Sequence, residues 1–437
     1  MRSYAALPAA QLFGSVLVPG DKSISHRSVM LGGICDGVSR IEGFLPSEDC
    51  LASMRAMRAL GVDIVQASPS EVSVRGVGLR GLQPAHDSLD MGNAGTAMRL
   101  FTGLLVGQAF DSRLIGDASL SKRPMERVAK PLRQMGAIVE TSNGTPPVQI
   151  RASSGLHGID YAMPVASAQV KSALLLAGLY ADGPTTVIEP APSRDHSERM
   201  LSAFGVRIQQ SHLTVRIEPV ARLHSCDIRV PGDFSSAAFF LVAGLIGAAG
   251  SGLLIRNVGL NPTRTGLLDI LRSMGATIEV QNARETGSEP VADLLVSRSE
   301  LQGIRVPAAL VPLAIDEFPS LFIAAACARG ETWITGAEEL RVKESDRIAV
   351  MSEGLRALGV QHEVFPDGMR IAGKPDGMAF AGGEVDSHGD HRVAMSFAVA
   401  SLRAGAEIRI RDVANVATSF PGFAALANGA GLRLTER

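Results

Sequence analysis

Apolar and polar positions follow one arrangement that recurs six times along this chain. Each copy holds a stretch with apolar residues at helical spacing, then a glycine, then a segment such as VDIV (62–65), in which apolar and polar residues alternate as in a strand. A glycine at this point can close the helix in the left-handed conformation. The six glycines stand 69 to 84 residues apart: Gly61, Gly136, Gly205, Gly275, Gly359 and Gly431. A period this regular predicts six structural repeats.

A second helix is predicted in each repeat, and its residues are apolar on almost every side. The stretches SALLLAGLY (172–180) and SLFIAAACA (320–328) are examples, and this composition is typical of a helix buried inside a domain. Each of these helices starts at a polar cluster, and the clusters lie at residues 22–27, 93–96, 167–169, 232–235, 316–319 and 389–392. Helices and strands mixed in every repeat predict an α/β fold with three repeats in each domain.

The chain has 437 residues, which exceeds what one hydrophobic core organises, so we expect two domains. Residues 234–255 carry no charge and are long enough to span a bilayer, but the pair Ser235-Ser236 and four glycines favour a buried helix followed by a strand. Residues 1–11 lack the basic start and apolar run of a signal peptide. We therefore expect a cytoplasmic protein that does not enter membranes.

Composition limits the partners that the chain can have. Hydrophobic residues make up 46% and charged residues 20%, as in a packed globular protein, and the formal net charge of −2 argues against a general affinity for nucleic acid or anionic membranes. The cysteines show no CxxC pair and no metal-ligand spacing with histidine; they are Cys35, Cys50, Cys226 and Cys327. Neither a disulfide framework nor a zinc site is predicted, and a reducing compartment fits this pattern.

The polar clusters are candidate anion sites, because the N-terminus of a helix has unpaired N–H groups and a partial positive charge. In KSISHR (22–27), Lys22, Ser23 and Arg27 lie close together on one helix and suit a phosphate or a carboxylate. Simple capping by serine, aspartate and asparagine, or a solvated basic helix end, explains each cluster about equally well. Basic residues at three of the clusters favour anion binding.

Two acidic residues stand among further cations in the second half of the chain. Lys343 and Arg347 are four residues apart and would share one face if this stretch is helical, and both lie close to Glu344. Asp316 precedes a buried helix and is a candidate general acid or base together with Glu344, although helix capping is the simpler explanation of its position. A surface helix with ion pairs would carry the same charges as residues 341–347.

Motifs of several common enzyme classes are missing from the sequence. It contains no Walker loop, no GxGxxG after a strand, no GxSxG, no HExxH, and no cysteine near a histidine in a catalytic arrangement. ATP-dependent phosphoryl transfer, nicotinamide chemistry, serine hydrolysis and zinc hydrolysis therefore lose support. Anionic substrates handled by cations and carboxylates, without a cofactor or a metal, remain.

Seven long motifs occur in order over nearly the whole chain: LVPGDKSISHR (17–27), MGNAGTAMR (91–99), GDASLSKRPM (116–125), ASAQVKSALLLAGL (166–179), IDEFPSL (315–321), ELRVKESDRI (339–348) and DHRVAMSFAVASL (390–402). Together they resemble the EPSP synthase (3-phosphoshikimate 1-carboxyvinyltransferase) family of enolpyruvyl transferases. The resemblance implies two domains, each an inside-out α/β barrel of three βαβαββ repeats. It places residues 1–20 and 232–437 in one domain, residues 21–231 in the other, and the active site in the cleft between them.

The resemblance also implies a reaction. The enolpyruvyl group of phosphoenolpyruvate is transferred to the 5-hydroxyl of shikimate 3-phosphate through a tetrahedral intermediate, with release of phosphate, on the route to chorismate and the aromatic amino acids. Asp316 and Glu344 match the acid-base pair, and Lys22 completes the catalytic set. The residues that match substrate-binding motifs are Lys22, Ser23, Arg27, Asn93, Gly95, Thr96, Arg123, Ser167, Ala168, Gln169, Arg194, Asp316, Lys343, Arg347 and Arg392. No cofactor is implied, and we expect a monomer.

Two departures make the chain similar to the second bacterial subgroup of the family. SRDH (193–196) has Arg194 where some members carry an aromatic residue, and TSFP (418–421) lacks a lysine that others have there. The related UDP-N-acetylglucosamine enolpyruvyl transferases are the nearest rival family, but residues 116–133 contain no cysteine for their reactive loop. RNA 3′-phosphate cyclase-like proteins, which use ATP and a covalent histidine, form a second rival class. A non-catalytic anion-binding protein is the third hypothesis.

Overall fold

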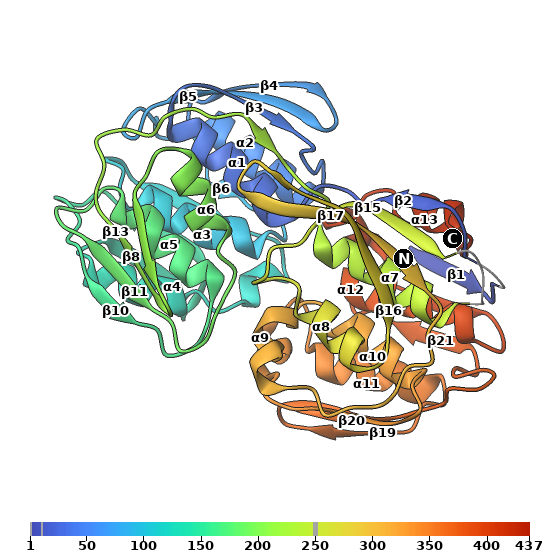
Figure 1. Cartoon of the computed structure of the whole chain (residues 1–437). Helices are drawn as coiled ribbons and strands as arrows, with labels where there is room; N and C mark the ends of the chain where they lie inside the picture. The colour runs from blue at the N-terminus through green and yellow to red at the C-terminus, as the bar shows by residue number, and fades with distance from the viewer. Residues whose placement is uncertain (1, 10–11, 248–251) are drawn as a thin grey trace. The chain divides into compact units, whose positions relative to one another are not determined.

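The structure of the chain, a computed structural model, describes residues 2–9, 12–247 and 252–437 (Figure 1). It divides into two compact units. Unit 1 consists of Met1–Pro19, Pro231–Glu285 and Pro290–Arg437, and unit 2 consists of Gly20–Val230 and Thr286–Glu289. Both units contain helices and sheets, which confirms the α/β fold class.

The three sheets of unit 2 share one pattern of strand pairing. In each, the first strand pairs in parallel with the second, the second antiparallel with the third, and the third antiparallel with the fourth. In sheet order the strands are β14 (Ile228–Arg229), β3 (Asp36–Glu42), β5 (Glu71–Val77) and β4 (Asp63–Ser68); β6 (Leu89–Asp90), β7 (Ser112–Ile115), β9 (Thr145–Arg151) and β8 (Ile138–Ser142); β10 (Asp160–Ala162), β11 (Thr185–Ile188), β13 (Thr214–Ile217) and β12 (Ile208–Ser211).

Three helices form the interior of unit 2, and its strands lie outside them (Figure 1). They are α1 (Lys22–Ile34), α3 (Gly95–Leu105) and α5 (Ala168–Gly178), and nearly all of their residues are buried, as their apolar composition predicted. Small residues let α3 and α5 pack closely, since a Cβ at Gly103 would lie 2.3 Å from the backbone oxygen of Ala173. The shorter helices are α2 (Glu48–Ala59), α4 (Glu126–Gln134), α6 (His196–Ala203) and η1 (Leu120–Lys122).

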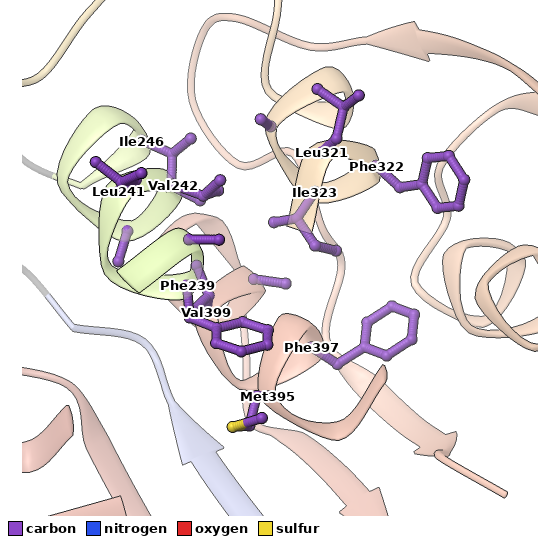
Figure 2. Close-up of a cluster of buried hydrophobic side chains, with 14 of the residues drawn as sticks. Phe239, Leu241, Val242, Ile246, Leu321, Phe322, Ile323, Met395, Phe397 and Val399 are labelled. Carbon is purple, nitrogen blue, oxygen red and sulfur yellow. The ribbon is translucent and has the colours of Figure 1, made fainter. Parts of the chain in front are cut away.

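The sheets of unit 1 surround a second set of apolar helices. In sheet order the strands are β16 (Thr277–Thr286), β17 (Glu289–Ser297), β15 (Leu253–Gly259) and β2 (Ser15–Leu17); β18 (Gly330–Ile334), β20 (Gly368–Gly373) and β19 (His362–Phe365); β21 (Gly383–Asp386), β22 (Ile408–Arg411), β1 (Ser3–Leu7) and β23 (Arg433–Glu436). The interior helices are α7 (Phe234–Ile246), α10 (Phe318–Ala326) and α12 (His391–Ala400). Figure 2 shows their side chains gathered in one cluster, with Phe239, Phe322 and Phe397 among them.

The remaining helices of unit 1 add further residues to this cluster, Leu267, Ile348 and Phe423 among them. They are α8 (Gly266–Ser273), α9 (Val311–Ala314), α11 (Arg347–Ala357), α13 (Phe423–Gly429), η2 (Ala308–Leu310), η3 (Glu338–Val342), η4 (Ser401–Arg403) and η5 (Ala414–Thr418). All six repeat glycines follow the end of a helix with φ between +78° and +108°, and a strand begins within a few residues of each. The predicted alternation of helix, glycine and strand is confirmed.

The uncharged segment at residues 234–255 is a helix followed by a strand, as predicted, over its described part. Every residue of α7 is buried, β15 begins at Leu253, and residues 248–251 lie outside the described residues, as do residues 1, 10 and 11 near the N-terminus. In the described parts of the chain, no single helix is long and apolar enough to cross a membrane. One pair, Ala308–Ala314 with Phe318–Ala326, meets the criteria of length and composition together but is bent by 120°.

Candidate active site

Arg27 projects from α1 and is held by neutral oxygen atoms. Its Nε donates to Ser197 Oγ at 2.7 Å, its Nη2 to Ser172 Oγ at 2.8 Å, and its Nη1 to the carbonyl oxygen of Ser23 at 2.9 Å. Burial lowers the pKa of the Arg27 guanidinium to about 10, so the group stays charged at neutral pH. Because its hydrogen-bond partners carry no charge, Arg27 keeps its positive charge for an anion.

Lys22 is the first residue of α1. The carboxylate of Asp21 caps this helix and accepts a hydrogen bond from the Ile24 amide at 2.9 Å. Lys22 Nζ lies 2.9 Å from Asp49 Oδ2 on α2, and both side chains are largely buried. The predicted cation is therefore held in place by a carboxylate that the sequence analysis did not single out.

Two guanidinium groups lie beside the first residue of α3, Gly95. A Cβ at Gly95 would lie 3.0 Å from Arg123 Nη1 and 3.2 Å from Arg99 Nη1. Arg123 Nη2 donates to Asn93 Oδ1 at 2.6 Å and to Ser119 Oγ at 3.3 Å. Since Ala94 gives α3 no side-chain cap, the N-terminus of this helix adds its own partial positive charge to that of the arginines.

Gln169 links α5 to α3. Its Oε1 accepts from Arg99 Nη1 at 2.6 Å and its Nε2 donates to Thr96 Oγ1 at 2.8 Å. Ser167 caps α5 by accepting from the Val170 amide at 3.4 Å, and Ala168 is the first helical residue. Gln169 therefore ties the N-terminal end of α5 to that of α3.

Arg194 lies in the loop between β11 and α6. Its side chain is half-buried, and its positive charge repels that of Arg27 and so helps to lower the pKa of Arg27. The structure thus brings Arg194 into the electrostatic neighbourhood of Arg27, as a shared anion site requires.

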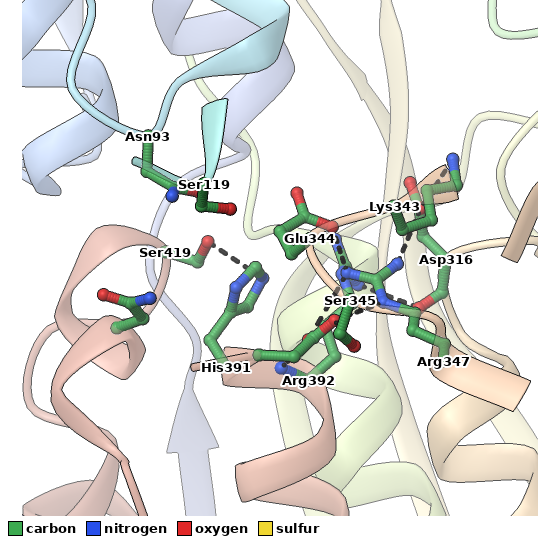
Figure 3. A network of polar contacts seen from close by, with 12 residues as sticks. Asn93, Ser119, Asp316, Lys343, Glu344, Ser345, Arg347, His391, Arg392 and Ser419 are labelled. Atoms are coloured by element: carbon green, nitrogen blue, oxygen red, sulfur yellow. Dashed lines mark hydrogen bonds and ion pairs between the residues drawn. The ribbon is translucent and has the colours of Figure 1, made fainter. Parts of the chain in front are cut away.

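Arg347 is the centre of the cluster in unit 1. With 1% of its side chain exposed, it donates from Nη2 to Glu344 Oε2 at 2.6 Å and from Nε to Asp390 Oδ2 at 2.8 Å, and its Nη1 lies 3.3 Å from Asp316 Oδ1. Figure 3 shows the guanidinium between Asp316 and Glu344. Burial by itself lowers the pKa of Arg347, but the three carboxylates raise it well above its usual value. Arg347 therefore fixes both candidate acid-base groups.

Lys343 and Arg392 complete this cluster. Lys343 Nζ lies 3.4 Å from Asp316 Oδ1, and Arg392 Nη1 donates to the Asp316 carbonyl oxygen at 3.1 Å. Lys343 and Arg347 do not lie on one helix, so the condition for a shared helical face is not met. Helix η3 ends at Val342, and α11 begins only at Arg347 because Asp346 caps it by accepting from the Ala349 amide at 3.0 Å.

Capping explains more of the polar clusters than the anion-site prediction allowed. Carboxylates or a hydroxyl cap four of the six interior helices: Asp21 on α1, Ser167 on α5, Asp233 on α7 and Asp390 on α12. A capping carboxylate offsets the positive end of its own helix. Helices α3 and α10 have no side-chain cap from their N-cap residues, and the N-cap residue of α10 is Glu317 rather than Asp316.

Several residues of the two clusters were missed by the sequence analysis. Asp390 and Arg99 belong to the quoted motifs, and their position at the start of an interior helix was a usable signal. Ser172 and Ser197 gave no signal, because they lie 145 and 170 residues from Arg27. Among the described residues, no group of three or more histidine, cysteine, aspartate or glutamate side chains could hold a metal ion.

The segment without the expected lysine has its own polar contact. Ser419 Oγ lies 3.0 Å from His391 Nε2 at the start of α12, and both side chains are buried (Figure 3). A contact between serine and histidine therefore stands in the segment where the expected lysine is absent.

Comparison with known proteins adds independent information on the chain as a whole. A family model described as EPSP synthase (3-phosphoshikimate 1-carboxyvinyltransferase) matches residues 8–426. A 3-phosphoshikimate 1-carboxyvinyltransferase of Alkalilimnicola ehrlichii is 60% identical over 98% of this chain and 96% of the relative. One of Methylococcus capsulatus is 58% identical over 98% and 97%.

Solved structures give the same result. An EPSP synthase from Acinetobacter baumannii superposes with a TM-score of 0.90 at 51% identity, and each chain covers 100% of the other. The enolpyruvyl transferase NikO from Streptomyces tendae superposes with a TM-score of 0.80 at 18% identity, which shows a shared fold.

Proposed function

Because the chain belongs to the EPSP synthase family of enolpyruvyl transferases, we propose that two groups of polar residues serve the reaction of that family. One lies at the helix starts of unit 2 around Arg27, and the other surrounds Arg347 in unit 1. The chain transfers the enolpyruvyl group of phosphoenolpyruvate to shikimate 3-phosphate, a step of the shikimate pathway to the aromatic amino acids. We infer that the acceptor is the 5-hydroxyl group and that phosphate leaves from a tetrahedral intermediate.

The contact of Arg347 with both Asp316 and Glu344 carries this assignment. In the addition step, Asp316 accepts the proton of the 5-hydroxyl group while the oxygen of that group bonds to C2 of phosphoenolpyruvate. Glu344 gives a proton to C3. In the elimination step, C3 returns its proton to Glu344, and Asp316 gives its proton to the leaving phosphate as the bond from C2 to the phosphate oxygen breaks. The double bond between C2 and C3 then forms again. A fixed guanidinium keeps both carboxylates oriented through these transfers.

The cations of unit 2 bind the anionic groups of the substrates in this proposal. Arg123, with Asn93, Gly95 and Thr96, holds phosphoenolpyruvate, and Lys22 contacts both substrates as the third catalytic group. Ser23, Arg27, Ser167, Ala168, Gln169 and Arg194 hold shikimate 3-phosphate. Lys343, Arg347 and Arg392 add positive charge beside Asp316. These charges stabilise the phosphates and carboxylates of both substrates without moving during the reaction.

We infer that each unit is a domain of three βαβαββ repeats arranged as an inside-out α/β barrel. The shared strand pairing of the three sheets in unit 2 and the six left-handed glycines support this arrangement. The cytoplasmic location and the monomeric state stay predictions.

Release of inorganic phosphate tests the proposed reaction. We expect the purified chain to release phosphate from phosphoenolpyruvate when shikimate 3-phosphate is present, and to show no turnover when UDP-N-acetylglucosamine replaces it. Asp316→Asn and Glu344→Gln should abolish turnover and retain binding of shikimate 3-phosphate in calorimetric titrations. Unchanged turnover in both variants would refute the acid-base assignment, and turnover with UDP-N-acetylglucosamine would support the rival family.

A further inference from the structure

Lys171 is a buried lysine that the proposed reaction does not use. It lies in the first turn of α5, with 1% of its side chain exposed, and its Nζ is 2.7 Å from Glu189 Oε2 and 2.7 Å from Glu198 Oε1. Both carboxylates are buried as well. Removing an ion from water costs several kcal/mol even after relaxation, so a buried ammonium persists where its partners and geometry hold it.

The ammonium of Lys171 ties together the loop that carries Arg194. Glu189 directly follows β11, and residues 189–195 lead to α6. Lys171 Nζ donates to the Ser193 carbonyl oxygen at 3.4 Å, and Ser193 Oγ donates a short hydrogen bond to Glu189 Oε1. One side chain on α5 therefore holds the start and the middle of the loop, and Arg194 is the residue after Ser193.

Glu198 connects the same lysine to Arg27. Among the charged groups that act on Arg27, Glu198 has the largest effect. The two serines that hold Arg27 flank this pair in sequence, since Ser172 follows Lys171 and Ser197 precedes Glu198. Because Lys171 takes up much of the negative charge of Glu198, Arg27 does not have to balance that carboxylate alone.

We propose that Lys171, with Glu189, is a positioning residue for shikimate 3-phosphate: it fixes the loop that presents Arg194 and leaves the charge of Arg27 available for the phosphate. This inference rests on the proposed roles of Arg27 and Arg194. Lys171 touches no substrate in this arrangement, so its effect passes through the two arginines and is confined to one of the two substrates.

Steady-state kinetics of Lys171→Met test the proposal. We expect the KM for shikimate 3-phosphate to rise about tenfold, the size of a typical coupling between charged neighbours, and the KM for phosphoenolpyruvate to stay within about twofold. Lys130→Met is the matched control, because Lys130 is exposed on α4 of the same unit, and its KM values should not change. In the double variant with Arg194→Ala, the lysine change should raise this KM by less than it does alone, because only the route through Arg27 remains.

Ser193→Ala decides the case if Lys171→Met does not fold, because it removes the bond to Glu189 and keeps every charge. We expect it to raise the KM for shikimate 3-phosphate about threefold, as expected when one hydrogen bond is lost. If Arg194→Ala leaves this KM unchanged, the proposed phosphate-binding set is wrong. If Arg194→Ala raises it while Lys171→Met and Ser193→Ala do not, the positioning role alone is wrong. Equal rises in both KM values, or fully additive effects in the double variant, would also overturn the positioning role.

Discussion

Replacing Gly95 by alanine tests the geometry around Arg123. The new methyl carbon would lie 3.0 Å from Arg123 Nη1 and 3.2 Å from Arg99 Nη1, whereas ordinary contacts begin near 3.4 Å. Both neighbours are the ends of flexible side chains, so the helix keeps its place and the guanidinium groups move by a few tenths of an ångström. Stability should therefore change little. Alanine in place of glycine favours a helix by about 0.5–1 kcal/mol, and this gain acts against the cost of moving the two guanidinium groups.

The cost of this substitution falls on substrate binding. Arg123 Nη2 bonds to Asn93 Oδ1 at 2.6 Å, and a displaced guanidinium cannot keep this bond and also meet an anion in the same geometry. A hydrogen bond to a charged group contributes about 1.5–3 kcal/mol, and losing about half of it weakens binding by about 1 kcal/mol. The KM for phosphoenolpyruvate should then rise about fivefold.

The assay compares KM values for both substrates with the free energy of unfolding in urea. Gly183→Ala is the matched control, because a Cβ at Gly183 meets no atom within 4 Å. We expect Gly95→Ala to change the KM for phosphoenolpyruvate alone, and Gly183→Ala to change neither. An unchanged KM for phosphoenolpyruvate, or a loss of stability above about 2 kcal/mol, would show that the methyl group is accommodated in another way.

Three further predictions follow from buried groups. Arg347→Met should lower the free energy of unfolding by about 3–5 kcal/mol, because Asp390, 0% exposed, loses its partner at 2.8 Å. Arg151→Met, which removes a half-exposed ion pair with Asp111, should lower it by less than about 1 kcal/mol, and equal losses in urea denaturation would contradict this. Burial first, and the charges of Lys22 and Arg27 next, hold the pKa of His26 well below its usual value. Below a pH of about 6.5 the unfolded chain binds a proton at His26 that the folded chain does not. The free energy of unfolding therefore falls with falling pH, by up to about 1.4 kcal/mol per pH unit. In His26→Gln this fall between pH 7.5 and pH 5.5 should be shallower, and a slope identical to that of the unmodified chain would count against the reasoning. Gly103→Ala should destabilise unit 2 by about 1–3 kcal/mol, since its Cβ would lie 2.3 Å from the Ala173 oxygen; an unchanged thermal unfolding temperature would show that α3 and α5 separate easily.

Much of the fold could be predicted from the sequence, because its repeats are marked by local signals. A glycine that closes a helix acts through its own backbone angles, so Gly61 and its five counterparts could be identified without knowledge of distant contacts. The apolar bodies of the interior helices were equally local. The order of strands within each sheet could not be read in this way, since it depends on pairing between segments far apart in the chain.

The site was predictable only where its residues stand together in a motif. The sequence brought Lys343 and Arg347 onto one face only if their stretch was helical. In the structure Asp346 caps a helix that begins at Arg347, and the two cations meet instead at Asp316 Oδ1. The serines that hold Arg27 lie in two other helices, and no spacing in the sequence points to them. Lys171 could be noticed as a charge in an apolar helix, but its carboxylate partners could not.

The two clusters use arginine in opposite ways, and this difference explains how a chain of net charge −2 can bind anionic substrates. Arg347 is surrounded by carboxylates, so its charge is balanced within the protein and serves to orient Asp316 and Glu344. Arg27, in contrast, donates its hydrogen bonds to serine hydroxyls and a carbonyl. Neutral partners fix a guanidinium without cancelling its charge, so the anion-binding capacity depends on which atoms hold each arginine more than on the number of basic residues.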